Sequence, residues 1–235
     1  MLDFSGKVVF IPGGTGALGS AIVHEFVISN ATVIATYLKE PSGIIESKAD
    51  KTIEMIRVDV TNEDEVSAAI STLRQKYGRI DIMVNVVGGY LGGKVVTEIS
   101  ENEWNGMMNL NLKSAFLLTK YAIPAIKASE HGGKIVHISS ITGLGANGLD
   151  SAYAASKAGL IRLVESASHE VKNDNINVNC ILPSIIDTEA NRKAMPNEDY
   201  TKWVKPHDLA NVILFLCSDY GKAITGAAIP TRGFS

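Results

Sequence analysis

The chain has 235 residues, of which 46% are hydrophobic and 20% are charged, a composition typical of a globular protein with a full core rather than of a disordered chain. With 22 basic and 25 acidic residues, it has no cationic excess to hold a phosphate backbone, which argues against nucleic-acid binding as its main role. Two cysteines rule out a disulfide framework, and Cys180 and Cys217 are expected to be small buried hydrophobic residues.

Short apolar runs alternate with helical patterns along the first half of the chain. Strands are predicted at 8–11, 31–36, 53–60 and 80–85, and residues 38–51 are expected to be mostly loop. A helix with apolar residues near a 3.6 period follows the first strand from Ala17 to Val27. Another is expected from Asn62 to Tyr77, capped by Thr61 and stopped by Gly78.

The alternation continues in the second half. Ser100 and Glu103 fit a capping box for a long helix that reaches about Ala128. Strands are predicted at 134–140, 175–182 and 227–229, helices at 151–172 and 207–218, and a polar segment at 187–205. Continuous apolar strands alternating with helices are typical of a parallel sheet covered on both faces. We therefore predict an α/β fold, a single doubly wound Rossmann domain over residues 1–235 with a parallel sheet of about seven strands.

A glycine-rich loop, Gly13-Gly-Thr-Gly16-Ala-Leu-Gly19, lies between the first strand and the first helix. Glycines at this place let the backbone approach a pyrophosphate at the helix N-terminus, where free N–H groups favour anions. A plain glycine-rich turn is the alternative interpretation. The loop lacks the Gly-Lys-Ser/Thr ending of an NTPase P-loop, so the sequence favours a dinucleotide.

The end of the second strand bears on the choice of cofactor. An acid there would select NAD, but the sequence reads Thr36-Tyr37-Leu38-Lys39. Lys39 is placed to meet a 2′-phosphate, unless it is only a solvated loop residue, and Thr15 offers a hydroxyl to a phosphate oxygen. We predict a preference for NADP(H), with NAD(H) as the alternative.

Tyr153 and Lys157 lie four positions apart at the start of a predicted helix, so their side chains share one face. A nearby ammonium stabilises a phenolate and lowers the phenol pKa, which would suit the tyrosine to general acid–base chemistry. Ser140 closes the preceding strand, where its hydroxyl would hold a substrate oxygen beside the tyrosine. An ordinary helix-surface pair is the competing interpretation of the Tyr–Lys spacing.

These residues resemble the short-chain dehydrogenase/reductase family over essentially the whole chain. The resemblance selects Ser140 over Ser139, because the family's serine lies thirteen positions before the tyrosine, and it assigns Asn111 a water beside Lys157 in a proton relay. It places Asp59 at the adenine, and Ile186 and Thr188 near the nicotinamide carboxamide. The catalytic set is then Ser140, Tyr153, Lys157 and Asn111, and the expected cofactor-binding residues are Gly13, Thr15, Ala17, Leu18, Gly19, Tyr37, Lys39, Asp59, Val60, Asn85, Gly88, Tyr153, Lys157, Pro183, Ile186 and Thr188.

Several positions depart from the family pattern and put the subfamily in doubt. Pro12 replaces a threonine, Val86 and Val87 replace Asn and Ala, and Ser184 replaces a glycine. Some loops, including Gly88-Gly-Tyr-Leu-Gly-Gly93, are similar to dihydropteridine reductase. The leading hypothesis is an NAD(P)-dependent oxidoreductase of a small or medium carbonyl or alcohol, with Tyr153 as general acid or base. Pterin reduction and a non-catalytic NAD(P)-sensing protein are the alternatives.

Other features limit the partners and the location. The sequence contains no run of about 18 apolar residues, so no membrane span is predicted. No signal peptide is expected, because Asp3 interrupts the first residues. We therefore expect a cytoplasmic protein. The histidines lack metal-ligand spacing, and no metal site is predicted. The family resemblance and the wide apolar surfaces of two long helices together predict a homo-oligomer, a tetramer or a dimer. The apolar residues that extend beyond one helix face are Phe116, Leu117, Leu118, Ile161, Leu163 and Val164. The segment 187–205, with Met195, Tyr200 and Trp203, is expected to form part of a pocket wall, to which Tyr90, Leu144 and Leu149 add apolar surface.

Overall fold

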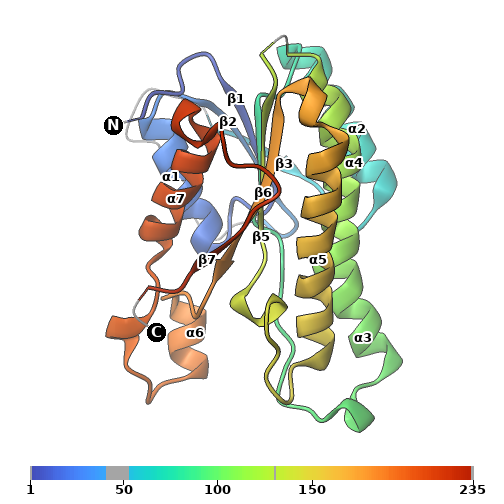
Figure 1. Cartoon of the computed structure of the whole chain (residues 1–235), viewed down its shortest axis with the longest axis vertical. Coiled ribbons are helices and arrows are strands. Elements are labelled where there is room, and N and C mark those ends of the chain that lie inside the picture. Colours follow the sequence, from blue (N-terminus) through green and yellow to red (C-terminus); the bar gives the residue numbers. More distant parts are fainter. Residues whose placement is uncertain (1, 41–52, 130, 234–235) are drawn as a thin grey trace.

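The fold is built on one parallel sheet, seen edge-on in Figure 1. The computed structural model describes residues 2–40, 53–129 and 131–233. Within them the sheet has seven strands in the order β3-β2-β1-β4-β5-β6-β7, and every neighbouring pair is parallel. The strands are β1 (Val8–Ile11), β2 (Thr32–Tyr37), β3 (Ile53–Arg57), β4 (Ile82–Asn85), β5 (Gly133–Ile138), β6 (Ile176–Pro183) and β7 (Ala228–Thr231). The predicted Rossmann fold class is confirmed.

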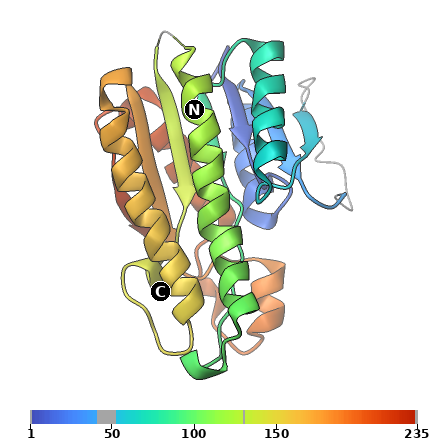
Figure 2. The same ribbon diagram turned by 90° about the vertical axis from the view of Figure 1, so that its right-hand side faces the viewer.

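Helices cover both faces of the sheet (Figures 1 and 2). On one side lie α1 (Ala17–Ile28) and α7 (Pro206–Cys217), and on the other α2 (Glu63–Tyr77), α4 (Ser114–Lys127) and α5 (Ser151–Glu170). Two shorter helices, α3 (Glu101–Met107) and α6 (Glu189–Ala194), lie at the end of the molecule to which the carboxyl ends of the strands point.

Two hydrophobic cores result from this layering. Successive side chains of a strand point to opposite faces, so Phe10 of β1 joins the core under α2, α4 and α5, whereas Val9 and Ile11 join the core under α1 and α7. Each of these three side chains is at most 1% exposed. Burial on both faces explains why the strands are continuous apolar runs in the sequence.

Two local predictions required correction. Asn62 rather than Thr61 caps α2, because its side chain accepts from the N–H groups of Asp64 and Glu65, whereas the Thr61 hydroxyl donates to Asp59. The predicted strand over 53–60 ends at Arg57, before that turn. The polar segment 187–205 contains α6, which begins where the Thr188 hydroxyl accepts from Asn191 N–H.

The long helix predicted from Ser100 to about Ala128 is interrupted. Its capping box is confirmed, since the Ser100 and Glu103 side chains each bond the other's backbone N–H. Between α3 and α4, however, residues Met108–Lys113 form a π-helical turn. Such turns widen the helix locally and are often found at functional sites. The insertion falls at Asn111, which belongs to the predicted catalytic set.

Most of the apolar residues expected at an oligomer interface are buried within their own chain. Leu117, Leu118, Ile161 and Val164 are buried in the core of their own chain, and Leu163 packs against that core. Phe116 alone of the six remains exposed, at 47%. The oligomer therefore stays a prediction that rests chiefly on the family resemblance.

Two composition-based expectations have a structural counterpart. Cys180 and Cys217 are free and buried, as expected. In the part of the chain that the structure describes, none of the helices combines the length and the apolar character needed to cross a membrane.

Candidate active site

A cavity of about 340 Å³ lies at the carboxyl ends of the central strands. The glycine loop, the segments after β4, β5 and β6, and the start of α5 all contribute to its wall. Open α/β sheets place their ligands at this edge, beside the point where the strand order reverses between β1 and β4. Ten predicted site residues line the cavity: Gly13, Ala17, Leu18, Gly19, Gly88, Ser140, Tyr153, Lys157, Pro183 and Ile186.

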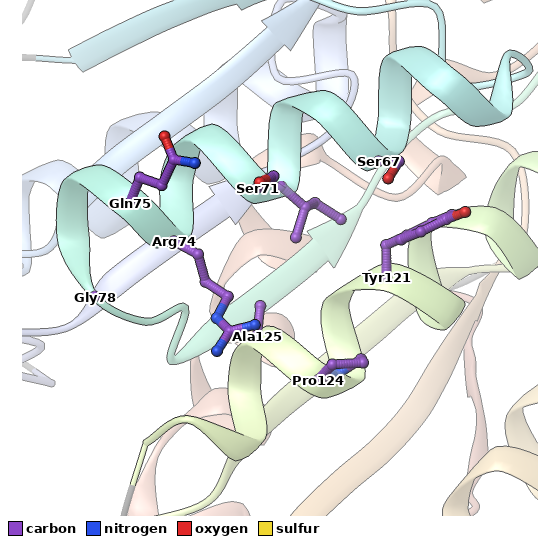
Figure 3. A pocket seen from close by; sticks show the side chains of 9 residues that line it. Ser67, Ser71, Arg74, Gln75, Gly78, Tyr121, Pro124 and Ala125 are labelled. Carbon is purple, nitrogen blue, oxygen red and sulfur yellow. The ribbon is translucent and has the colours of Figure 1, made fainter.

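Two larger hollows lie elsewhere and contain none of the predicted residues. One, of about 440 Å³, lies between α2 and α4, where Arg74 reaches across toward Pro124 and Ala125 (Figure 3). The other, of about 490 Å³, lies at the amino ends of the strands. Size therefore does not identify the site; the convergence of titratable groups and the glycine loop does. Among the described residues no group of three or more His, Cys, Asp or Glu side chains is arranged to hold a metal.

The glycine loop has the backbone geometry of an anion-binding turn. Gly16 is the N-cap of α1 and provides no side-chain bond, so the N–H groups of the first turn have no side-chain cap, and residues 16–19 line the cavity. The turn is tight: a Cβ added at Gly19 would lie 2.2 Å from the Gly13 carbonyl oxygen. The missing side chains leave backbone N–H groups at a positive helix end, the arrangement that binds phosphates.

Lys157 is buried beneath Tyr153 at the start of α5. Its Nζ donates to the Ile138 carbonyl oxygen at 2.8 Å and lies 5.9 Å from the centre of the Tyr153 ring. Burial lowers the pKa of Lys157 to about 8. Ser139 donates to the Lys157 carbonyl oxygen, whereas the Ser140 hydroxyl faces the Tyr153 phenol.

The expected direction of the Tyr153 pKa shift was wrong for this geometry. The pKa of Tyr153 is raised, because burial disfavours the phenolate; the Ser140 hydroxyl lowers it and the Asp150 carboxylate raises it further. The Lys157 ammonium, which donates to the Ile138 carbonyl oxygen, does not offset the effect of burial on the Tyr153 pKa. In this arrangement Tyr153 is protonated at neutral pH.

Asn111 connects the π-helical turn to the loop after β4. Its side-chain oxygen accepts from Gly89 N–H at 2.8 Å, while its Nδ2 donates to the Gly89 carbonyl oxygen at 3.1 Å and to Ser156 Oγ at 3.0 Å. Asn111 thus fixes the loop beside Lys157 through both backbone groups of one glycine. The predicted water on Asn111 stays a prediction.

The other predicted cofactor residues do not line the cavity: Thr15, Tyr37, Lys39, Asp59, Val60, Asn85 and Thr188. Tyr37 ends β2, and Lys39 is exposed just beyond it. The Asp59 carboxylate accepts from the Thr61 N–H and hydroxyl, which lowers the Asp59 pKa. Val60 is buried.

The cavity also contains residues that sequence reasoning missed or assigned only to the wall. Asn191 lines it and donates to the Ile186 carbonyl oxygen at 2.8 Å. Tyr90, expected only as apolar surface, packs its ring against Tyr153. Trp203, expected at the pocket wall, is 6% exposed and does not line the cavity; its ring lies 4.8 Å from that of Tyr200, in the same segment.

The chain is similar to known proteins over nearly its whole length. A family model described as "Enoyl-(Acyl carrier protein) reductase" matches residues 14–233. A 3-oxoacyl-(acyl-carrier-protein) reductase of Thermotoga maritima is 32% identical, covering 99% of this chain and 98% of that protein. Its counterpart in Chlamydia muridarum is 34% identical, covering 97% and 96%. A solved structure described as ElxO with NADP bound is 29% identical, covers 97% of both chains and superposes with a TM-score of 0.89.

Proposed function

We propose that this chain catalyses the NADPH-dependent reduction of a ketone to an alcohol. The chain belongs to the short-chain dehydrogenase/reductase family and is an NAD(P)-dependent oxidoreductase. Family membership confirms the resemblance inferred from the glycine loop and the Tyr–Lys pair. The observation that carries the proposal is the convergence of Ser140, Tyr153 and Lys157 on one cavity with the glycine loop.

Each side chain has a distinct task in this proposal. The nicotinamide, when bound, supplies the hydride. Ser140 and Tyr153 present two neighbouring hydroxyls, which suit one carbonyl oxygen, and Tyr153 donates the proton that the reduced oxygen needs. Because burial raises its pKa, Tyr153 holds that proton at neutral pH, the state required for reduction.

Lys157 and Asn111 support Tyr153 from the protein side. The Lys157 side chain lies under the tyrosine ring, where it places positive charge near the phenolate that forms after proton transfer. Asn111 anchors the Gly89 backbone beside it, and we assign to Asn111 the water through which the phenolate regains a proton.

NADPH is proposed over NADH because the end of β2 offers no acid. Tyr37 ends the strand and Lys39 follows, so a 2′-phosphate would meet an ammonium rather than a carboxylate. The similarity to a structure with NADP bound supports the same choice.

A 3-oxoacyl thioester is the first substrate to test, because the two curated relatives are reductases of that class. The family model is described instead by enoyl reduction. Two adjacent hydroxyls favour a carbonyl oxygen over a carbon–carbon double bond, and a cavity of about 340 Å³ suits a small or medium substrate.

The experiment compares wild-type protein with Tyr153→Phe. NADPH oxidation is followed with a 3-oxoacyl thioester, a 2-enoyl thioester and a quinonoid dihydropterin, and cofactor binding is measured by fluorescence. We expect turnover with the 3-oxoacyl thioester and a loss of roughly 10²–10⁴-fold or more in the variant, which still binds NADPH.

Other outcomes identify the competing functions. Turnover of the enoyl or pterin substrate alone would replace the ketone proposal. Cofactor binding without turnover of any substrate in a wider carbonyl panel would favour a sensor. Wild-type turnover by Tyr153→Phe would remove the tyrosine from the mechanism.

A further inference from the structure

Asp150 stands at the N-cap of α5 but does not cap it. Aspartate at this position normally accepts a hydrogen bond from the first turn of its own helix, which stabilises that helix. The Asp150 side chain makes no such bond. It accepts instead from the hydroxyl of Tyr90 at 2.7 Å, across 60 positions of sequence. A helix-stabilising group is thus directed toward another loop.

A backbone hydrogen bond also joins the two loops that contain Tyr90 and Asp150. Gly93 N–H donates to the Leu149 carbonyl oxygen at 2.9 Å. Leu149 has a φ of 70°, a left-handed conformation that bulky residues rarely adopt. Strain of this kind is retained where the surroundings impose it, often at active sites. The strained residue directly precedes Asp150.

Tyr90 reaches from this junction to the catalytic tyrosine. Its ring lies 5.0 Å from that of Tyr153, with an angle of 79° between the planes. This edge-to-face arrangement is a favoured one for aromatic pairs. Tyr90 also lines the cavity. The Tyr90 side chain is therefore held at its hydroxyl by Asp150 and packs its ring against that of Tyr153.

We infer that Tyr90 and Asp150 form a positioning pair, in which Asp150 holds the Tyr90 hydroxyl and the Tyr90 ring fixes the Tyr153 ring through an edge-to-face contact. The inference rests on the proposed role of Tyr153 as proton donor. Neither residue touches the reacting atoms. They act by holding the donor in one orientation and in its protonated form.

The charges around Tyr153 support the second part of this role. The groups that act on its phenol are Ser140, Asp150 and Tyr90, with Lys157 beneath the ring. The Asp150 carboxylate adds to burial in raising the pKa of Tyr153. The same carboxylate, through its hydrogen bond, raises the pKa of Tyr90 to about 12, so Tyr90 remains the donor of the pair.

Gly92→Ala displaces the pair sterically. A Cβ at Gly92 would lie 2.1 Å from the Tyr90 hydroxyl and 2.4 Å from Asp150 Oδ1, both at the ends of side chains, so the pair must move. Gly148→Ala is the matched control in the other loop, since its Cβ would meet nothing within 4 Å. We expect kcat to fall about tenfold to hundredfold in Gly92→Ala alone, with NADPH affinity unchanged in both.

Asp150→Asn tests the charge and serves if Gly92→Ala does not fold. The amide oxygen still accepts from Tyr90, but the negative charge is gone, so the pKa of Tyr153 should fall. We expect the alkaline limb of the kcat profile for reduction to move to lower pH. A merely structural role would leave that limb in place.

A readout independent of turnover separates this inference from the proposed function. Ring-carbon NMR of labelled tyrosine, with Tyr153 assigned from Tyr153→Phe, reports its environment and titration in each variant. We expect the Tyr153 resonance to shift in Gly92→Ala and to titrate at lower pH in Asp150→Asn, whatever the substrate. An unchanged Tyr153 resonance in both variants would overturn the pairing, even where wild-type turnover supports the proposed function.

Discussion

His137 of β5 should make the fold sensitive to acid. The imidazole is fully buried; its Nδ1 lies 3.2 Å from Asn85 Nδ2 and its Nε2 lies 3.0 Å from Thr119 Oγ1. At Nδ1 the Asn85 amide is the donor. Because the Thr119 hydroxyl donates to the Ala115 carbonyl oxygen, Nε2 carries the proton and Nδ1 accepts. A second proton would face the Asn85 donor.

The structure gives the size and sign of the effect. Burial, and secondarily the Lys157 charge, lowers the pKa of His137 from 6.5 to about 3. Below pH 6.5, the ordinary pKa of histidine, His137 binds a proton in the unfolded chain but not in the folded chain. The folding stability therefore decreases as the pH is lowered. The loss is about 1.4 kcal/mol per pH unit, or about 3 kcal/mol by about pH 4.5. This loss of stability stops growing only when the pH approaches the folded-state pKa of His137, about 3.

The assay is urea unfolding at about pH 7.5, 5.5 and 4.5 for the wild type and His137→Gln. Glutamine can both accept from Asn85 and donate to Thr119, but it does not titrate. We expect the variant to be less stable than wild type at neutral pH and to close or reverse that gap in acid. His169→Gln, at an exposed position of α5, controls for loss of an imidazole. Parallel pH slopes in wild type and His137→Gln would refute the reasoning.

Three further predictions address the cofactor and the assembly. Lys157→Ala should lower both turnover and NADPH affinity measured by fluorescence, and an unchanged affinity would speak against cofactor binding by Lys157. Lys39→Ala should reduce the preference for NADPH over NADH in kcat/KM several-fold, because an exposed ammonium–phosphate contact contributes little more than that; a ratio that favours NADH in wild type, or does not move, would contradict the role of Lys39. Light scattering at micromolar concentration should give the mass of a tetramer or dimer, and a monomer mass would exclude the predicted oligomer.

Much of the fold could be predicted from local patterns. The apolar runs that became β1 and β2 are buried on both faces, so their composition alone indicated a parallel sheet. Boundaries were less accurate, because caps are chosen by competition between neighbouring side chains. Thr61 was available to cap α2, but its hydroxyl bonds Asp59, and Asn62 takes the cap.

The site was predictable wherever its residues follow a local rule. Tyr153 and Lys157 share a face because α5 is a helix, and the glycine loop lies at the cavity because it joins β1 to α1. Ser140 lies there because it follows β5, whose carboxyl end borders the cavity. Asn111 needed the family resemblance, since nothing local indicates that a π-helical turn brings its amide to Gly89.

The layered fold, the sheet edge with the candidate site and most of the side chains that line its cavity were predictable from local patterns, because periodicity and strand ends act over a few residues. The orientation of those side chains depends on long-range packing. Packing between distant segments directs the Lys157 ammonium to Ile138, buries the Tyr153 phenol and turns Asp150 from its own helix to Tyr90. Burial and neighbouring charges set a pKa, and both come from residues far apart in the chain, so the direction of the Tyr153 shift could not be read from its spacing to Lys157.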